Sequence, residues 1–235
     1  MSFFKQHWRA LLLAAALAVG ALNIFGCGGK GDGAKGESGT FTDSRDGKVY
    51  KTVTIGRKNW MAENLNYKAD NSFCYDNDES NCAKYGRFYD WNTAKTTCPT
   101  GWHLPSNQEW DDLAQAAGGK KANHDYDDGF DWQGAGEKLK AKNGWYNETS
   151  NGTDDFGFSA LPGGMRTNDR SNGIGFYGIW WTATGGSSDT TAYQRSMTSY
   201  DAVMNDGQGN DESTDLAENI YTTGDSWLSV RCIQD

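Results

Sequence analysis

The hydrophobic pattern of this chain begins with one continuous apolar run and then breaks into short segments that alternate with polar residues. After the turn signal Asp46-Gly47, residues 49–55 place valine and isoleucine between polar or aromatic residues, a pattern typical of a strand. Gly56-Arg57 marks a second turn before residues 59–62. The pattern therefore predicts two short antiparallel strands, over 49–55 and 59–62.

Further short segments rich in aromatic and β-branched residues predict the rest of a sheet. Strands are expected over residues 85–91, 156–161, 179–184, 192–197 and 228–233. Brief helices are expected over residues 93–97 and 137–142, and loops over residues 74–82 and 118–135. Short strands with clustered helices are typical of an α+β fold built around antiparallel sheet.

One helix carries both a start and a stop signal. Ser106 is followed three residues later by Glu109, the capping-box spacing in which a hydroxyl and a carboxylate each satisfy a backbone N–H. Trp110, Leu113 and Ala117 then form an apolar stripe at helical spacing, and a glycine pair follows. The pattern predicts a helix that anchors the scaffold and ends at that pair.

The first residues predict export. Lys5 and Arg9 precede an apolar run, Ala10–Leu22, which is too short for a spanning helix but suits a signal peptide. The sequence Ile24-Phe25-Gly26-Cys27 resembles a bacterial lipobox, which implies cleavage after residue 26 and acylation of Cys27. The Gly-rich residues 27–39 then predict a flexible tether.

We therefore expect a lipid-anchored protein of the bacterial cell envelope, at the outer membrane or the cell surface, with the membrane as a partner through its anchor. An ordinary secretory signal with a chance cysteine is the alternative. The domain organisation predicted is a signal peptide over residues 1–26, the lipidated tether over 27–39 and one globular domain over 40–235.

Charge narrows the choice of partners. The chain has 22 Lys and Arg against 31 Asp and Glu, a net charge of −9, and it has no stripe of basic residues. Such a surface repels phosphate backbones, which argues against nucleic-acid binding. The ten tryptophans and only three prolines indicate an aromatic core rather than a disordered surface protein.

Four cysteines remain once Cys27 is lipidated, and an even number in an exported protein indicates disulfides. Three pairings are open. We favour Cys74–Cys82, which closes a small loop, and Cys98–Cys232, which ties the end of the sequence to its middle. A zinc site is the rival interpretation, and the absence of any CxxC pair weighs against it.

Several motifs together resemble the Fibrobacter succinogenes major paralogous domain, a family of exported bacterial proteins without an assigned biochemical role. The likeness covers about residues 40–235. It rests on residues 54–56, 60–67, 74–78, 85–87, 98–105, 109–110, 157–164, 181–182 and 229–232, together with Tyr89.

Two wider likenesses bear on the fold. Residues 103–110 resemble a stretch of formylglycine-generating-enzyme-type domains, and the order of helices and cysteines resembles the C-type-lectin fold. The second likeness implies a Cys98–Cys232 pair and an architecture of short antiparallel strands, two main helices and long loops. An oxidase of the first type would need a reactive cysteine, whereas we expect Cys232 to be locked in a disulfide.

Catalytic and metal constellations are sparse, and we expect no cofactor and no enzymatic activity. His103 and His124 are the histidines open to a hydrolase, but no Gly-x-Ser-x-Gly elbow occurs. The acidic stretches 76–79 and 125–128 are alternatives for calcium, although such loops are more often simply solvated. A carboxylate pair for glycoside hydrolysis cannot be recognised from sequence, since it depends on separation in space.

Aromatic residues beside Gly/Asn/Asp-rich loops favour a binding function, because such rings stack on sugars. They are Trp145, Tyr146, Tyr177, Trp180, Trp181, Tyr193 and Tyr200, and we choose Tyr177, Trp180, Tyr193 and Tyr200 as the ligand-binding candidates. The loops 165–178 and 199–225 are the expected ligand-facing surface. The function predicted is non-catalytic binding of a polysaccharide or another surface protein. A carboxylate-based hydrolase and a purely structural envelope lipoprotein are the alternatives.

Overall fold

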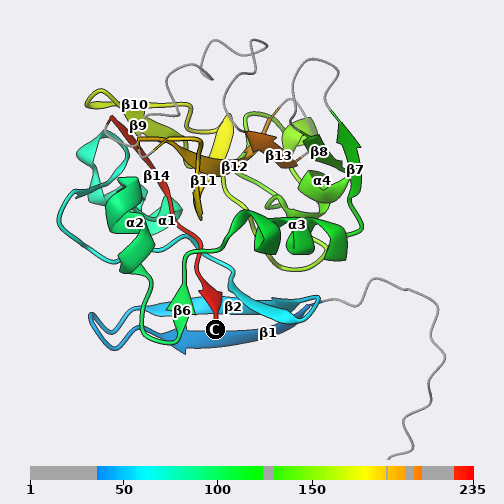
Figure 1. Cartoon of the computed structure of the whole chain (residues 1–235), viewed down its shortest axis with the longest axis horizontal. Helices are drawn as coiled ribbons and strands as arrows, with labels where there is room; N and C mark the ends of the chain where they lie inside the picture. The colour runs from blue at the N-terminus through cyan, green and yellow to red at the C-terminus, as the bar shows by residue number, and fades with distance from the viewer. Residues whose placement is uncertain (1–35, 124–129, 189, 200–203, 208–224) are drawn as a thin grey trace, which may run out of the picture. The chain divides into compact units, whose positions relative to one another are not determined.

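Two sheets and four α-helices make up the part of the chain that the structure describes (Figure 1). This computed structural model describes residues 36–123, 130–188, 190–199, 204–207 and 225–235. The chain divides into two units, Met1–Asp32 and Gly33–Asp235, and every described residue lies in the second. That unit contains both disulfides and both hydrophobic clusters of the described residues. The chain is therefore an α+β protein, as predicted.

The first sheet joins the early strands to the last one. Its order is β1 (Glu37–Thr42), β2 (Val49–Ile55), β3 (Lys58–Met61), β15 (Ile233–Gln234) and β6 (Trp102–His103), all antiparallel. The strands β2 and β3 confirm the two that the sequence predicts. Residues 37–39, expected in the tether, pair with β2 as part of β1, so strand structure begins before residue 40.

The second sheet is larger and mixed. Its order is β10 (Arg170–Asn172), β9 (Met165–Thr167), β14 (Ser226–Ser229), β11 (Tyr177–Gly185), β12 (Ala192–Thr198), β13 (Met204–Gly207), β8 (Phe130–Gln133) and β7 (Lys120–Asn123). The short strands β5 (Phe88–Tyr89) and β4 (Ser72–Phe73) extend it from β14. The pairing of β11 with β14 is parallel and the other pairings are antiparallel.

The described helices are short. They are α1 (Glu79–Tyr85), α2 (Trp91–Thr97), α3 (Asn107–Ala116) and α4 (Ala135–Leu139), with 3₁₀ turns at Tyr75–Asn77 and Glu148–Ser150. In α3 the capping box is confirmed, because Ser106 Oγ accepts the Glu109 N–H and the Glu109 carboxylate accepts the Ser106 N–H. The brief helices expected over residues 93–97 and 137–142 correspond to α2 and α4, with shifted bounds, whereas α1, which Asp78 caps, was not expected.

Three sequence predictions of local structure are wrong. Residues 74–82, expected as a loop, contain the start of α1, and residues 118–135 contain β7 and β8. Residues 156–161, expected as a strand, form turns, because Gly157 and Ser159 have positive φ. Their backbone instead pairs with the residues after α4, where Ala141 N–H donates to Ala160 O at 2.9 Å.

The core divides into two clusters on either side of β11. Trp180 belongs to one with Trp60 and Trp110, and Trp181 belongs to the other with Tyr89 and with Leu228 of β14. Successive side chains of a strand point to opposite faces of its sheet, so the Trp-Trp pair reaches both clusters. Both tryptophans are fully buried.

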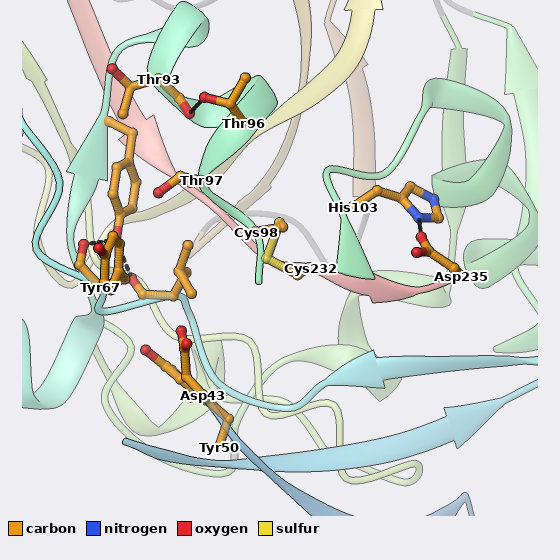
Figure 2. Close-up of a disulfide and its surroundings, with 12 residues drawn as sticks. Asp43, Tyr50, Tyr67, Thr93, Thr96, Thr97, Cys98, His103, Cys232 and Asp235 are labelled. Atoms are coloured by element: carbon orange, nitrogen blue, oxygen red, sulfur yellow. Dashed lines mark hydrogen bonds and ion pairs between the residues drawn. A yellow bond between two sulfur atoms is a disulfide. The ribbon is translucent and has the colours of Figure 1, made fainter. Parts of the chain in front are cut away.

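Both predicted disulfides are confirmed. Cys74–Cys82 joins residues on either side of the start of α1, and Cys98–Cys232 joins the end of α2 to the segment between β14 and β15. Figure 2 shows the second bond beside the short strands β6 and β15. It cross-links residues 134 positions apart and so constrains the unfolded chain strongly.

Candidate functional site

A groove of about 500 Å³ lies where five segments of the chain meet. Its lining comes from β2, from the residues after β3, from α1, from the residues after α4 and from residues 154–161. Volumes of 300–1,000 Å³ are typical of ligand sites. The residues that line it are Lys48–Lys51, Ala62–Asn64, Asn66, Cys82–Lys84, Gly86, Ala141–Asn143, Asp154, Ser159 and Leu161.

Asn64 fixes the groove to the core. Its Oδ1 accepts three hydrogen bonds, from Trp180 Nε1 at 2.8 Å and from Arg231 Nε and Nη2 at 3.0 and 2.8 Å. Its Nδ2 donates to Tyr85 O at 2.8 Å. One amide thus ties together β11, the segment after β14 and the end of α1, which makes this side of the groove rigid.

Arg231 lies behind Asn64 as a buried positive charge, 1 % exposed. Its Nη1 donates to Phe158 O at 2.6 Å and to Met61 O at 3.2 Å, and its guanidinium stacks on the Phe158 ring at 4.4 Å. Desolvation lowers the pKa of Arg231 to about 9, while Glu63 and Asp154 act in the opposite direction. The guanidinium therefore stays protonated at neutral pH, and the negative charges of these two groove carboxylates favour that charged form.

Both groove carboxylates are already bonded to the protein. Glu63 accepts the backbone N–H of Lys51 at 2.7 Å. Asp154 accepts the N–H of Ser159 at 2.8 Å and its hydroxyl at 2.6 Å. Asp154 and Ser159 both have positive φ, 47° and 54°, a conformation that costs energy in a residue with a Cβ. The two Asp154 contacts stabilise this turn of the groove wall.

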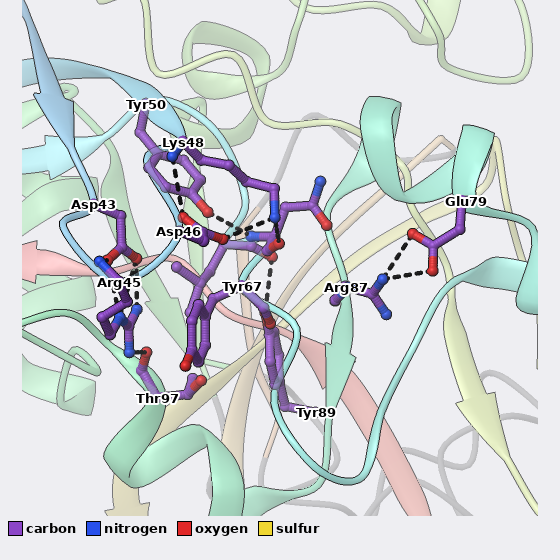
Figure 3. A network of polar contacts seen from close by, with 12 residues as sticks. Asp43, Arg45, Asp46, Lys48, Tyr50, Tyr67, Glu79, Arg87, Tyr89 and Thr97 are labelled. Atoms are coloured by element: carbon purple, nitrogen blue, oxygen red, sulfur yellow. Dashed lines mark hydrogen bonds and ion pairs between the residues drawn. The ribbon is translucent and has the colours of Figure 1, made fainter.

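Four lysines also line the groove. Figure 3 shows Lys48 beside Tyr50, with its Nζ donating to Asp46 and to Asn66 O, both at 2.8 Å. Lys51, Lys84 and Lys142 are exposed, and within the described ranges no carboxylate lies within ion-pair distance of any of them. Three ammonium groups from three segments thus remain open to solvent at one groove.

The α1 wall is held in place by its own contacts. Asp78 caps the helix by accepting the Ser80 N–H, and the Cys74–Cys82 bond ties its first turn to the preceding segment. Glu79 forms an ion pair with Arg87 at 2.7 Å, shown in Figure 3. These contacts fix the backbone from which Lys84 projects.

The four aromatic residues expected to bind a ligand differ from one another in burial. Trp180 is fully buried and its indole N–H bonds to Asn64. The prediction that Trp180 faces a ligand is therefore wrong, because β11 is covered on both faces. Tyr177 and Tyr193 are half-buried, and Tyr177 packs against the second core cluster. Tyr200 lies outside the described residues, and Tyr177, Trp180 and Tyr193 are not among the residues that line the groove.

An exposed aromatic pair forms elsewhere. Tyr146 is 61 % exposed and stacks on Phe176 with ring centroids 4.3 Å apart and planes inclined by 30°. Tyr146 was among the aromatic residues recognised in sequence, whereas Phe176 was not. The pair joins the segment after α4 to the start of β11, and within it Tyr146 presents an exposed ring.

The expected loop surface is only partly described. Residues 165–178 contain β9 and β10, so this segment is a hairpin at the sheet edge rather than a loop. Of residues 199–225, those at 200–203 and 208–224 lie outside the described residues. One sequence signal could have indicated the groove. Its lining residues 62–64, 66, 86, 159 and 161 belong to the motifs on which the family resemblance rests.

His103 has a structural environment. Its Nδ1 lies 2.6 Å from Asp235 Oδ1, and its Nε2 lies 3.0 Å from Glu109 Oε1; Figure 2 shows the Asp235 contact. Burial acts to raise the pKa of Glu109, but hydrogen bonds from Ser106 and His103 outweigh it and lower that pKa. Within the described part of the chain, His103 has no serine or cysteine partner of a hydrolase triad. His124 lies outside the described residues.

The acidic stretches do not form a recognisable calcium site where they are described. Asp78 caps α1 and Glu79 pairs with Arg87, while residues 125–128 lie outside the described residues. Cys74, Cys82 and Glu79 bring their ligand atoms within 4.8 Å of one another. The two sulfurs are joined in a disulfide, so they offer no thiolate to a metal.

The predicted export signal and lipidation site lie outside the described residues, since residues 1–35, including Cys27, are not among them. Among the helices that are described, none has the length and apolar character needed to cross a membrane.

Comparison with known proteins identifies the domain. The model of the Fibrobacter succinogenes major domain matches residues 53–234, a segment that contains both disulfides and most of the groove. No match is found among curated proteins or among solved structures. The chain belongs to the Fibrobacter succinogenes major domain family.

Proposed function

We propose that this chain is a non-catalytic ligand-binding protein of the bacterial cell surface, and that its ligand is an extracellular polysaccharide. The groove beside Asn64 carries the proposal, because it has the volume of a ligand site and a polar lining of ammonium, amide and carboxylate groups. Such groups form hydrogen bonds with sugar hydroxyls. A concave polar surface supports binding over a purely structural role.

The rigidity of the groove supports binding as well. The polar atoms of Asn64 are all engaged with the core, so this residue holds the site in shape rather than contacting a ligand. Preorganisation lowers the entropic cost of binding. Asn143, by contrast, is exposed on the rim, and its amide is free to bond a hydroxyl.

The exposed aromatic pair extends the proposed site. Lys142 and Asn143 line the groove, and Tyr146 follows three residues later on the same segment. A sugar ring stacked on Tyr146 and Phe176 is the kind of contact that aromatic faces make with carbohydrates. A polymer chain reaching from the groove to this pair would use both.

The architecture and the anchor complete the proposal. A C-type-lectin-like arrangement is supported by the Cys98–Cys232 bond and by β15, which returns to the sheet of β2 and β3. The lipobox-like residues before Cys27 support acylation there and display of the domain beyond a Gly-rich tether. Labelling with a radioactive fatty acid in cells, lost in Cys27→Ala, tests the anchor.

The binding experiment uses the unit of residues 33–235, because it contains its own core and both disulfides. Retention on insoluble polysaccharides is compared for the parent, for Ala83→Trp, which fills the groove from α1, and for Gln115→Trp, an exposed control on α3. We expect retention that is lost only in Ala83→Trp. No retention on any polymer contradicts the proposal. Capture of a surface protein by the same groove would show that the ligand is a protein and not a polysaccharide.

A carboxylate-based hydrolase is the second candidate, because Glu63 and Asp154 line one groove. Their bonds to Lys51 and Ser159 favour a structural role for both. Incubation with soluble polysaccharides and measurement of new reducing ends distinguishes the two functions. Release by the parent that disappears in Glu63→Gln would establish the hydrolase and contradict the non-catalytic proposal.

A further inference from the structure

We infer that the groove selects polysaccharides that carry negative charge, as carboxylate or sulfate groups. This inference rests on the proposed function, since it names the class of polysaccharide that the same groove takes. It begins from a contrast in charge, because the groove is lined by four lysines and two carboxylates in a chain of net charge −9.

The negative charges of the two groove carboxylates do not cancel the positive charges of the lysines. Glu63 and Asp154 are bonded to backbone and hydroxyl groups of the wall, and both act on the buried guanidinium of Arg231. The positive charge of Arg231 thus offsets part of their charge from behind the wall. The ammonium groups of the rim keep their own charge facing the groove.

Three of those ammonium groups have no carboxylate partner among the described residues, although Lys84 Nζ also lies over the Tyr85 ring at 4.7 Å. Lys48 is paired with Asp46, but in the described residues no carboxylate pairs with Lys51, Lys84 or Lys142. They project from β2, from α1 and from the segment after α4. A polymer lying in the groove would meet positive charge from three of its sides.

A concave site with an excess of one sign of charge, here four lysines against two carboxylates, concentrates ions of the other sign. An acidic protein repels a polyanion over most of its surface, so the lysine rim also confines such a ligand to one place. A repeating anionic polymer fits better than a single small anion, because the three ammonium groups belong to separate segments. Lysine acts as a point charge and does not distinguish carboxylate from sulfate.

The experiment compares polymers that differ in charge alone. Binding of residues 33–235 to polygalacturonate is measured beside its methyl ester, and binding to dextran sulfate beside dextran. We expect binding to a charged member of a pair, little to its neutral counterpart, and weaker binding as salt rises, because salt screens exposed charges. Binding to either charged polymer, with little binding to its neutral counterpart, supports the inference, because the lysines do not distinguish carboxylate from sulfate.

The variants place the effect in the groove. In Lys51→Gln/Lys84→Gln/Lys142→Gln we expect the affinity for the charged polymer to fall by about two- to fivefold per lysine. Arg57→Gln/Lys120→Gln/Arg170→Gln makes the same change in net charge at exposed positions outside the groove, and we expect it to bind like the parent.

The outcomes separate this inference from the proposed function. Equal binding to charged and neutral members, or a groove variant that binds like the control variant, overturns the inference and leaves polysaccharide binding intact. Binding to neither charged polymer, with retention on a neutral one, also overturns it. Retention on no polymer at all contradicts the proposed function itself.

Discussion

The replacement Asn64→Ala tests whether one buried amide holds the groove to the core. The change removes the acceptor of three hydrogen bonds, from Trp180 Nε1 and from two nitrogens of Arg231, and the donor to Tyr85 O. Asn64 is 7 % exposed and Arg231 1 % exposed, so water does not readily replace the lost partner.

The magnitude follows from these contacts. A buried donor left without a partner costs about 1–3 kcal/mol, and removing the partner of a buried charge costs about 3–5 kcal/mol. The backbone carbonyls of Met61 and Phe158 still hold Nη1 of Arg231. We therefore expect the free energy of unfolding to fall by about 3–5 kcal/mol, a large share of the usual stability of a domain.

Two variants provide matched comparisons. Asn64→Asp keeps an acceptor facing Arg231 but places a second oxygen against Tyr85 O in place of the donor; the carboxylate's attraction to the guanidinium offsets part of that repulsion, so we expect a loss of about 1–2 kcal/mol. Asn143→Ala removes an exposed amide from the same groove, and we expect a change within about 0.5 kcal/mol.

The assay is equilibrium unfolding of residues 33–235 in urea at pH 7 with the disulfides intact, followed by tryptophan fluorescence. Stability is compared through the midpoint and the slope of the transition. A loss below about 1 kcal/mol in Asn64→Ala, or a ranking in which Asn64→Asp is the less stable of the two, would refute the reasoning about this hub.

Three further predictions concern the supports of the site. The pKa of Glu109 is lowered in the folded protein, so its ionised carboxylate stabilises the fold above the ordinary glutamate pKa, and this contribution is lost as pH falls through the lower folded value. The difference in the free energy of unfolding between the parent and Glu109→Gln should therefore narrow between about pH 5 and pH 3. A difference that does not change with pH in urea titrations would contradict this prediction. Replacing Cys98 and Cys232 by Ala should lower the free energy of unfolding by about 5 kcal/mol and replacing Cys74 and Cys82 by about 2–3 kcal/mol, since the closed loops differ in length; the reverse order in thermal or urea unfolding would exclude loop length as the cause. Tyr146→Ala should weaken polysaccharide binding by about 0.5–1.5 kcal/mol in a titration while Tyr146→Phe, which keeps the ring, should not, and equal affinities for both would remove the aromatic pair from the site.

Local signals in the sequence predicted the scaffold well wherever a short-range pattern is sufficient. The Ser106 and Glu109 spacing gave α3, because a capping box involves residues three apart. The local pattern did not predict α1, because Asp78, which caps this helix, lies in an acidic stretch that equally suits a loop. The local pattern also predicted a strand over residues 156–161 that does not form, because the positive φ of Ser159 depends on contacts with Asp154.

The candidate site was much less predictable than the scaffold. Lys51, Lys84 and Lys142 are distant in sequence and belong to no motif, so only the folded chain brings them to one groove. Trp180 was expected to face a ligand, yet burial depends on whether both faces of its strand are covered, which a Gly-rich neighbourhood does not reveal. The burial of Arg231 was likewise not predictable from its neighbours in sequence, because it depends on hydrogen-bond partners that are distant along the chain.

The most direct test of the account is nuclear magnetic resonance of isotope-labelled residues 33–235 titrated with a polygalacturonate oligosaccharide and, separately, with a sulfated one. Binding in the groove predicts shift changes concentrated at Lys51, Lys84, Lys142 and Asn143, residues that line it. Changes that leave these residues unaffected at saturating ligand, with perturbation confined to another surface, would contradict the assignment of the groove as the binding site.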